Sequence, residues 1–378
     1  MSAPITCVRD LRERARRRIP RAIFEYADRG AYDELTLRRN REALDAIELR
    51  ARAMLNVDNA STATALIGEP AAMPLAIAPT GLTGLFHADG EIHGARAALK
   101  FGVPFTLSTM SICSIEDVRE ATGQPFWFQL YVMRDRGFTR SLIERARAAQ
   151  CSALMLTADL QIQGQRHRDL KNGLSVPPRL TLANLLDTAT KVGWWTRMLG
   201  AKRRSFGNLD GRIQGADGLT TLSQWIAAQF DPTVTWKDLA WIRDLWPGKL
   251  IVKGLLDAED ARAAVAEGVD AIVVSNHGGR QLDGAPAAIS VLPEIVDAVA
   301  GRTEILFDSG VMSGQDVLKA VALGARGCLI GKAFLYSLAA GGEAGVRTAL
   351  EIIQKELRVS MALTGQTDAR KLDRSALR

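Results

Sequence analysis

Cysteine, histidine and tyrosine are scarce in this chain, which has four of each among 378 residues. The cysteines Cys7, Cys113, Cys151 and Cys328 lie far apart, and none belongs to a CxxC pair or to a Cys/His spacing. Such spacing argues against a disulfide framework and against a metal site. We therefore expect four reduced thiols and no bound metal.

Long apolar runs are also missing. No stretch approaches the ~18 uninterrupted apolar residues of a membrane-spanning helix. The N-terminus is Arg-rich, carries acids and has no apolar core of signal-peptide length. These absences predict a protein that is made and kept on the cytoplasmic side.

The charge of the chain is only modestly positive. A net charge of +6 suits an anionic partner such as an acidic substrate, a cofactor phosphate, a membrane surface or a nucleic acid. No nucleic-acid-binding motif is present, and the acidic residues are well interspersed with the basic ones. We therefore expect no nucleic-acid partner.

Short apolar runs alternate with amphipathic stretches from Pro74 onward. Eight runs are candidate strands: Leu75–Ala78, Pro104–Leu107, Phe126–Leu130, Ala153–Thr157, Leu250–Val252, Ala271–Val274, Ile305–Phe307 and Gly327–Ile330. Helix-like segments follow most of them, as at Ile115–Ala121, Gly137–Ala149, Ala258–Glu267, Leu292–Val299 and Gln315–Leu323. Short buried strands that alternate with helices predict parallel β/α units. Eight units favour an α/β fold closed into a (β/α)8 TIM barrel over an open sheet.

The length of the chain fits one barrel with additions. We expect a single domain over residues 1–378, with an N-terminal helical cap at about 1–65, the barrel at about 70–365 and an insertion at about 177–235. Helical periodicity runs from Val8 to Arg41 and is interrupted at Gly30.

The expected insertion follows the fourth strand and breaks the regular alternation. It contains Lys191–Leu199 and Lys202–Phe206, where basic residues are interleaved with Trp, Met, Leu and Phe. This composition suits the headgroup zone of an anionic membrane, so we predict peripheral membrane contact through residues 190–210. A solvated lid or an oligomer contact is the alternative.

Polar and ionisable residues follow the predicted strands, where a barrel carries its active site. A packed core alone would not require polar residues at the ends of these apolar runs. From the first strand to the eighth, they are Pro79 and Thr80, Ser108, Gln129 and Tyr131, Thr157 and Asp159, Lys253, Ser275 with His277 and Arg280, Asp308, and Gly331.

The block Val274–Gly284 carries the strongest chemical signal. His277 stands just past a strand end, two glycines follow it, and Arg280 comes three residues on. Imidazole titrates near neutrality, so His277 is the candidate general base, and Asp159 would orient its ring. Arg280 and Arg166 would clamp a carboxylate through paired hydrogen bonds. A helix cap for Asp159 and a surface position for Arg166 are the alternatives.

Several segments resemble the FMN-dependent 2-hydroxy acid oxidases and dehydrogenases. They are Ile77–Thr80, Phe128–Tyr131, Val252–Gly254, the Val274–Gly284 block, Glu343–Val346 and Met361–Gly365. The resemblance implies oxidation of an L-2-hydroxy acid to the 2-oxo acid with reduction of bound FMN. A barrel isomerase or lyase without net redox chemistry and a non-catalytic binding protein are the rival classes.

The resemblance also implies a role for each candidate residue. His277, Asp159 and Lys253 would be catalytic, with Lys253 stabilising negative charge on the reduced flavin. Besides His277, the substrate would meet Tyr26, Tyr131, Arg166 and Arg280. FMN would be held by Pro79, Thr80, Ser108, Gln129, Thr157, Lys253, Ser275, Asp308, Gly310, Gly331 and Lys332.

Substrate and electron acceptor divide this family. Ser108–Cys113, Phe230–Pro232 and the insertion resemble bacterial L-lactate dehydrogenases, whereas Trp241–Pro247 equally resembles mandelate dehydrogenase. The first resemblance implies oxidation of L-lactate to pyruvate, a quinone acceptor, a homotetramer and a peripheral position on the cytoplasmic side of the inner membrane. The alternatives are oxidation of mandelate, or of glycolate or another 2-hydroxy acid by oxygen.

Three residues depart from the family pattern. Met312 and Lys332 stand where arginines are usual, and Gln161 stands where proline is common, two residues after Asp159. The missing guanidinium at Met312 predicts weaker FMN retention, and Lys332 keeps the charge but loses the fork of donors. Gln161 predicts a looser loop around Asp159 and Arg166.

Overall fold

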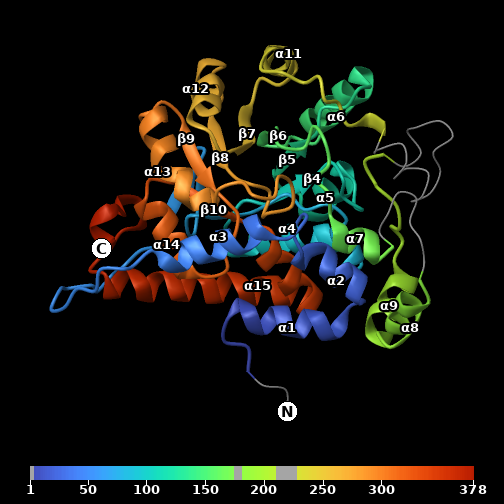
Figure 1. Ribbon diagram of the computed structural model, residues 1–378, viewed down its shortest axis with the longest axis horizontal. Helices are drawn as coiled ribbons and strands as arrows, with labels where there is room; N and C mark the ends of the chain where they lie inside the picture. Colours follow the sequence, from blue (N-terminus) through green and yellow to red (C-terminus); the bar gives the residue numbers. More distant parts are fainter. Residues whose placement is uncertain (1–3, 174–180, 210–227) are drawn as a thin grey trace.

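Eight parallel strands form the centre of the molecule, a computed structural model that describes residues 4–173, 181–209 and 228–378. The sheet order is β3-β10-β9-β8-β7-β6-β5-β4, and a parallel bridge between Ile77 and Phe105 joins its two edges. The sheet thus closes into the predicted barrel (Figure 1). All eight candidate strands are confirmed as β3 (Leu75–Ile77), β4 (Thr106–Ser108), β5 (Trp127–Leu130), β6 (Ala153–Thr157), β7 (Lys249–Leu255), β8 (Ala271–Val274), β9 (Glu304–Phe307) and β10 (Gly327–Ile330).

Alternation along the strands decides which side chains enter the barrel. Halfway along, the inward positions are apolar and form one buried cluster that includes Trp127, Met155, Ile251, Val273 and Leu306. Two residues further on, the same face of each strand carries polar side chains, namely Gln129, Thr157, Lys253, Ser275 and Asp308. The period of two therefore delivers these groups together to the C-terminal end of the barrel, called the mouth below.

A short hairpin, which we did not predict, packs at the opposite end of the barrel. β1 (Thr64–Leu66) pairs antiparallel with β2 (Glu69–Ala71), and Leu66 joins the apolar cluster of the interior. Glu69 accepts a hydrogen bond from the indole of Trp127 (3.1 Å), which fixes the hairpin to β5. The mouth is thus the end that remains for a ligand site.

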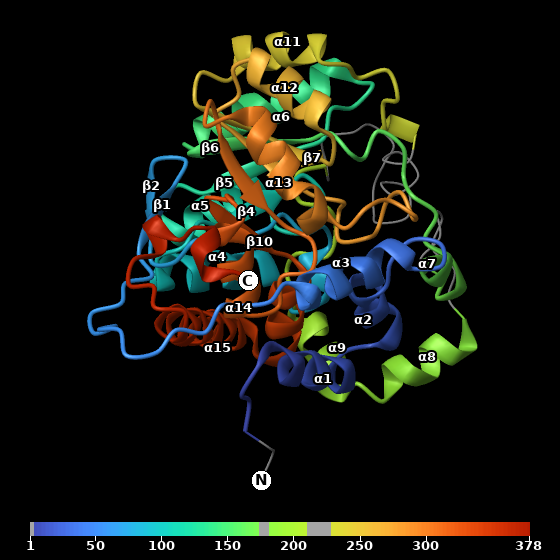
Figure 2. The ribbon, with the colours of Figure 1, turned by 60° about the vertical axis from the view of Figure 1, so that its left-hand side comes forward.

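Helices surround the barrel on its outside (Figures 1 and 2). The predicted helical segments are confirmed with shifts of a few residues at their ends. α5 shows the local reason for its bounds, because Ser114 and Asp117 form a capping box at its start and Gly123 ends it with φ 64°. The covering helices are α4 (Gly90–Phe101), α5 (Ile115–Thr122), α6 (Arg136–Ala148), α11 (Lys237–Leu245), α12 (Ala258–Ala266), α13 (Ala288–Val299), α14 (Gly314–Ala322) and α15 (Lys332–Leu363).

The N-terminal helices are α1 (Val8–Arg18), which packs on α15, and α2 (Arg21–Asp28) and α3 (Leu35–Ala46), which contact the loops at the mouth. Gly30 separates α2 from α3 as predicted. The N–H of Ala31 donates to the carbonyl of Gly279 (2.9 Å). A side chain at Gly279 (φ 72°) would place its Cβ 2.6 Å from the backbone nitrogen of Leu37. The glycine is needed because two backbones meet there.

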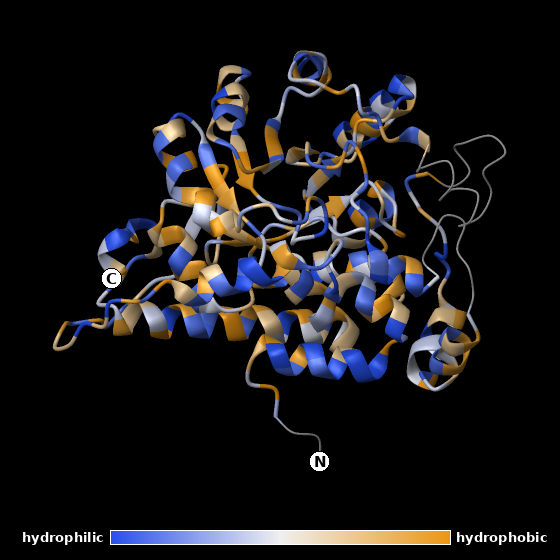
Figure 3. Cartoon of the chain, in the orientation of Figure 1, coloured by the Kyte–Doolittle hydropathy of each residue, from blue (hydrophilic) through white to orange (hydrophobic). Residues whose placement is uncertain are grey.

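The described part of the long connection from β6 to β7 contains α11 and, before it, α7 (His167–Lys171), α8 (Leu182–Ala189) and α9 (Val192–Gly200). Apolar residues recur along α8 and α9 (Figure 3), and Leu182, Leu186 and Leu199 are 73 %, 63 % and 64 % exposed. No helix in the described ranges combines the length and the apolar character needed to cross a bilayer.

The basic run after α9 differs from our expectation of an outward, membrane-facing surface. Arg203 pairs with Asp89 (2.9 Å) and Asp117 (2.8 Å), and Phe206 is buried. These residues therefore fasten the connection to the barrel helices. Within the described part of the expected insertion, the exposed large apolar side chains lie on α8 and α9.

The chain after α15 returns to the segment that follows α3. It forms two short 3₁₀ turns, η2 (Ala369–Lys371) and η3 (Arg374–Ala376), before Leu377 pairs with Leu49. The N–H of Ala369 donates to the carbonyl of Ser61 (3.0 Å). The cysteines Cys7, Cys113, Cys151 and Cys328 are all free, as expected.

Candidate active site

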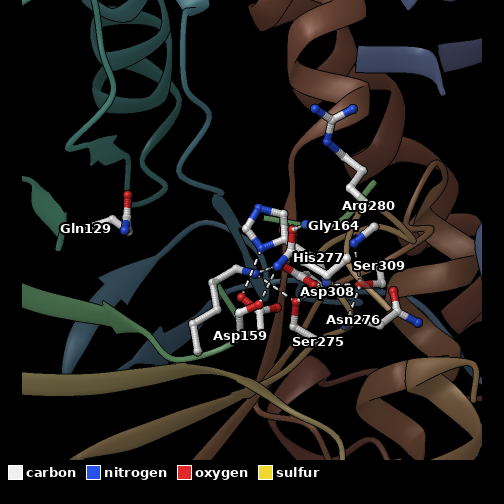
Figure 4. Close-up of polar contacts among 12 residues, drawn as sticks. Gln129, Asp159, Gly164, Ser275, Asn276, His277, Arg280, Asp308 and Ser309 are labelled. Atoms are coloured by element: carbon white, nitrogen blue, oxygen red, sulfur yellow. Dashed lines mark hydrogen bonds and ion pairs between the residues drawn. The ribbon is translucent and has the colours of Figure 1, made fainter. Parts of the chain in front are cut away.

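His277 lies just beyond β8 in a left-handed backbone conformation (φ 58°). Its backbone N–H donates to Oγ of Ser275 (3.1 Å), and Nδ1 of its ring lies 3.0 Å from Oδ1 of Asp159 (Figure 4). Asp159 follows β6, so the barrel unites two residues that are 118 positions apart. A left-handed histidine is uncommon and is typical of a functional residue held by its surroundings.

Burial and charge set the protonation of this pair. Burial lowers the pKa of His277, although Asp159 opposes the shift, so the imidazole is neutral near pH 7. Burial alone would raise the pKa of Asp159, but the attraction of His277 and Lys253 outweighs it and the pKa is lowered. Because the carboxylate holds Nδ1, the other ring nitrogen, Nε2, is free to accept a proton.

Lys253 is buried beside two acids at the mouth. Its Nζ donates to Oγ of Ser275 (2.7 Å) and forms an ion pair with Oδ2 of Asp308 (2.9 Å). Burial would lower the pKa of Lys253, but Asp308 and Asp159 more than reverse this effect, so the pKa is raised and the ammonium stays charged. A fixed cation in this position can stabilise negative charge that develops next to it.

Gln129 carries a donor that lacks a partner. Its Oε1 accepts from Oγ of Ser108 (2.9 Å), whereas its Nε2 is buried and makes no hydrogen bond with any residue in the described ranges. Figure 4 shows Gln129 well apart from the group around His277. A buried amide without an acceptor is costly, and a ligand between these groups would supply one. The pyrimidine edge of a flavin has carbonyl acceptors of this kind, so these residues fit FMN.

The turns after β3, β9 and β10 are neighbours at the mouth, because β10 pairs with both β3 and β9. We expect the phosphate of FMN to bind at these turns. A Cβ on Gly331 would lie 3.7 Å from the methyl group of Thr80, which follows Pro79, and Gly310 (φ 101°) packs against α3. Nζ of Lys332 donates to the carbonyl of Asp28 (2.9 Å). Burial, together with the charge of Arg280, lowers the pKa of Lys332 to about 7.

Arg280 and Arg166 lie together under α2. The guanidinium of Arg280 is 4.7 Å from the ring centre of Tyr26 and donates to the backbone carbonyls of Tyr26 and Arg29. Arg166 is 9 % exposed, so its surface alternative is wrong, and its Nε donates to the carbonyl of Arg280 (3.2 Å). Burial and the charge of Arg280 lower the pKa of Arg166 to about 10. Two guanidiniums in this setting favour an anionic ligand.

Tyr131 follows β5 and closes the site from the side of Asp159. Its ring packs edge-on against Phe230, with ring centres 5.8 Å apart. Burial raises the pKa of Tyr131, and the negative charge of Asp159 adds to the shift. The phenol therefore stays protonated and can donate a hydrogen bond.

Several supporting residues were not predicted from the sequence. Asn40 of α3 and Asn276 exchange amide hydrogen bonds of 2.8 and 2.7 Å, which fix the cap to the His277 loop. Gln281 donates to the carbonyls of Asp159 (2.7 Å) and Ile162 (2.9 Å). No local pattern could have indicated these partners, because they are distant in the sequence.

We expected the loop around Asp159 to be looser because Gln161 stands where proline is common. The side chain of Gln161 instead ties this loop down. Its Nε2 donates to the carbonyl of Val234 (2.5 Å), which lies on the chain that returns from the connection after β6. The bond joins the loop of Asp159 to that returning chain. A side-chain contact thus takes the place of backbone stiffness.

Comparison with known proteins agrees with this geometry. The model of the FMN-dependent dehydrogenase family matches residues 15–378. An L-lactate dehydrogenase of Caulobacter vibrioides is 48% identical over 99% of this chain and 97% of its own length, and one of Pseudomonas aeruginosa is 50% identical over 96% and 95%. The crystal structure of the monotopic membrane protein (S)-mandelate dehydrogenase superposes with a TM-score of 0.95 at 35% identity and covers 100% of both chains. The chain therefore belongs to the FMN-dependent dehydrogenases and is an FMN-dependent enzyme.

Proposed function

We propose that this enzyme oxidises L-lactate to pyruvate. The observation that carries the proposal is the pair of His277 and Asp159 beside the buried Lys253. Relatives named L-lactate dehydrogenase, 48% and 50% identical to this chain, support lactate as the hydroxy acid.

The site residues divide the work between binding and proton transfer. Arg166 and Arg280 hold the substrate carboxylate, because paired guanidinium bonds orient it. Tyr131 donates to the substrate oxygen, and Tyr26 packs on Arg280 and keeps that guanidinium in place. Bound in this way, the substrate presents its hydroxyl-bearing carbon to His277.

His277 removes the proton of the reaction at Nε2. Asp159 keeps the ring in the tautomer with hydrogen on Nδ1 and stabilises the imidazolium that forms. FMN would supply the acceptor for the two electrons that leave the substrate carbon. Lys253 and Gln129 would hold its pyrimidine edge, and Lys253 would offset the negative charge gained there.

A membrane quinone is the proposed electron acceptor. The exposed leucines of α8 and α9 support a peripheral membrane contact, since they offer an apolar surface next to basic residues. A structural relative described as a monotopic membrane protein supports the same placement. We infer attachment to the cytoplasmic face through α8 and α9.

A second candidate substrate is mandelate. It is favoured by the TM-score of 0.95 to (S)-mandelate dehydrogenase, although the identity is lower than to the lactate enzymes. The reaction and the residues would be the same, and only the pocket that receives the substrate side chain would differ.

Anaerobic bleaching of the flavin tests these proposals. The holoenzyme is mixed with L-lactate, (S)-mandelate, glycolate and a longer L-2-hydroxy acid, and the rate of bleaching is compared. L-lactate should bleach it with the highest kcat/KM, and a quinone analogue should reoxidise it faster than oxygen. His277→Ala should retain FMN and lose bleaching by about a thousandfold. Bleaching of that variant at the rate of the unmodified enzyme would contradict the assigned base.

A further inference from the structure

Asp169 is a buried acid that the proposed mechanism does not use. It lies in α7, which packs beside α2 (Figure 1), and only 7 % of the residue is exposed. Its Oδ2 lies 4.0 Å from a guanidinium nitrogen of Arg280. In the part of the chain that the structure describes, no other residue forms an ion pair or a hydrogen bond with this carboxylate. Asp169 thus adds a negative charge to the group of residues expected to bind the substrate carboxylate.

The position of Asp169 in the sequence suggests a local role, which its contacts do not support. It stands in the first turn of α7, where an acidic residue commonly stabilises a helix. However, α7 has only five residues, and no side chain forms a capping hydrogen bond at its start. The carboxylate is instead paired with Arg280, which lies on the loop after β8. Its main partner therefore belongs to a different part of the mouth.

Burial and charge act in opposite directions on Asp169. Burial raises the pKa of its carboxyl group. The positive charges of Arg280, Arg166 and Lys332 oppose this shift. Glu25 of α2 is the other acid that acts on the group, and it adds to the rise. Because three cations face the carboxyl group, it remains ionised near pH 7.

The charges at this place can be counted. Arg166 and Arg280, called the clamp below, carry two positive charges, and Asp169 supplies one negative charge beside them. A single positive charge is left for the substrate. L-lactate and pyruvate have the same carboxylate, so a stronger clamp would bind substrate and product equally well. Such uniform binding lowers KM without speeding the chemical step, and it slows release of the product.

We propose that Asp169 weakens the clamp by competing with the substrate carboxylate for the charge of Arg280, so that the product anion can leave. The inference rests on the proposed role of Arg166 and Arg280 in binding that carboxylate. Two anions that approach the same guanidinium repel each other, and in a buried site this repulsion is stronger than in water. Asp169 sets the affinity for the anion and takes no part in the transfer of protons or electrons.

Titration of the oxidised holoenzyme with pyruvate and with oxalate tests the inference without turnover, because a bound anion changes the flavin absorbance. Asp169→Asn should lower the dissociation constant of pyruvate by about tenfold and that of oxalate, a dianion, by more. Asp169→Ala should tighten binding of both anions as well, since the effect depends on the charge and not on the shape of the side chain. Asp33→Asn is the matched control, because it removes the same charge from an exposed position between α2 and α3. It should leave both constants unchanged.

Kinetics separate this role from a purely structural one. In anaerobic bleaching, Asp169→Asn should lower the KM for L-lactate by about tenfold while the rate at saturation stays the same. If Asp169 only held Arg280 in position, both variants would bind the anions more weakly and KM would rise. Weaker or unchanged binding, or equal tightening in Asp33→Asn, would therefore overturn the inference and leave the oxidation intact. Absence of bleaching of the unmodified enzyme with every hydroxy acid would instead overturn the proposed function.

Discussion

Nζ of Lys332 donates to the backbone carbonyl of Asp28 across 2.9 Å, so the first residue of α15 is joined to the last residue of α2. Arg280 also binds the C-terminal end of α2, where its guanidinium donates to the carbonyl of Arg29 (3.2 Å). Two cations thus share the negative end of α2, one at the expected phosphate site and one at the substrate site. Their mutual repulsion is one reason for the lowered pKa of Lys332.

We predict that FMN affinity falls as the pH rises above 7. The pKa of Lys332 is about 7 without phosphate, and the dianion must raise it because it stabilises the ammonium. Below pH 7 Lys332 is already protonated in the protein without FMN. Above pH 7 Lys332 must take up a proton when FMN binds, so the affinity for FMN falls by up to about tenfold per pH unit. Fluorescence titration of the apoprotein with FMN at pH 7 and pH 9 measures the slope. Lys332→Arg should flatten it, and equal slopes in both forms would refute the linkage.

Met312→Arg should tighten FMN binding by about tenfold, since it restores a charge-assisted donor for the phosphate. Met312 is half-buried, and its N–H is held by Asp316 (2.9 Å), so the backbone is already fixed for the longer side chain. Met312→Gln serves as the uncharged control of similar length. The dissociation constant of FMN is the measurement, and the idea fails if Met312→Arg binds no more tightly than Met312→Gln.

Asp159→Asn should lower the rate of flavin bleaching by about a hundredfold or more, because the imidazolium loses its counter-charge. Asp159 raises the pKa of His277 against the effect of burial. Its removal should therefore lower that pKa further, and the acid limb of the kcat/KM profile should move to lower pH. An acid limb that stays in place or moves upward would show that His277 does not govern it.

Gly279→Ala should destabilise the fold and weaken substrate binding. Its Cβ would lie 2.6 Å from the nitrogen of Leu37, so α3 must move, and we expect a loss of about 2–4 kcal/mol in the free energy of unfolding. Gly284→Ala is the control, because Gly284 also has a positive φ (87°) but nothing lies within 4 Å of its added Cβ. It should lose only about 1 kcal/mol. Urea unfolding compares the two, and similar losses would mean that backbone strain alone explains both.

The double variant Leu182→Ser and Leu186→Ser should reduce binding to vesicles of phosphatidylglycerol and phosphatidylethanolamine by about tenfold or more, because two exposed apolar side chains are lost. Leu363→Ser removes a leucine at the end of α15 that is as exposed as Leu186 (63 %), and it should leave binding unchanged. Cosedimentation gives the bound fraction. Equal binding of both variants would place the membrane contact elsewhere.

The barrel could be predicted because each strand has a local sequence pattern. An apolar run followed by a polar residue, such as Ile272–Val274 before Ser275, indicates both the buried part of a strand and its end at the mouth of the barrel. The hairpin of β1 and β2 escaped detection because its strands are three residues each and read as a loop.

The candidate site was predictable only in part. His277 and Asp159 follow strands and Lys253 lies in the second half of β7, so the barrel had to bring them together. The bonds between Asn40 and Asn276 and between Gln161 and Val234 depend on the mutual approach of distant loops, which no spacing in the sequence encodes. The prediction of a looser loop at Gln161 considered only the backbone and did not anticipate the bond from its amide to Val234.

The return of the chain after α15 to Leu49 and Ser61 has a consequence for how the protein reaches its active form. Two parts of the chain that are distant in the sequence must meet before the segment that leads from the cap into the barrel is fixed. Loss of these contacts should therefore loosen the cap that carries Tyr26 and Asn40, although neither residue touches them.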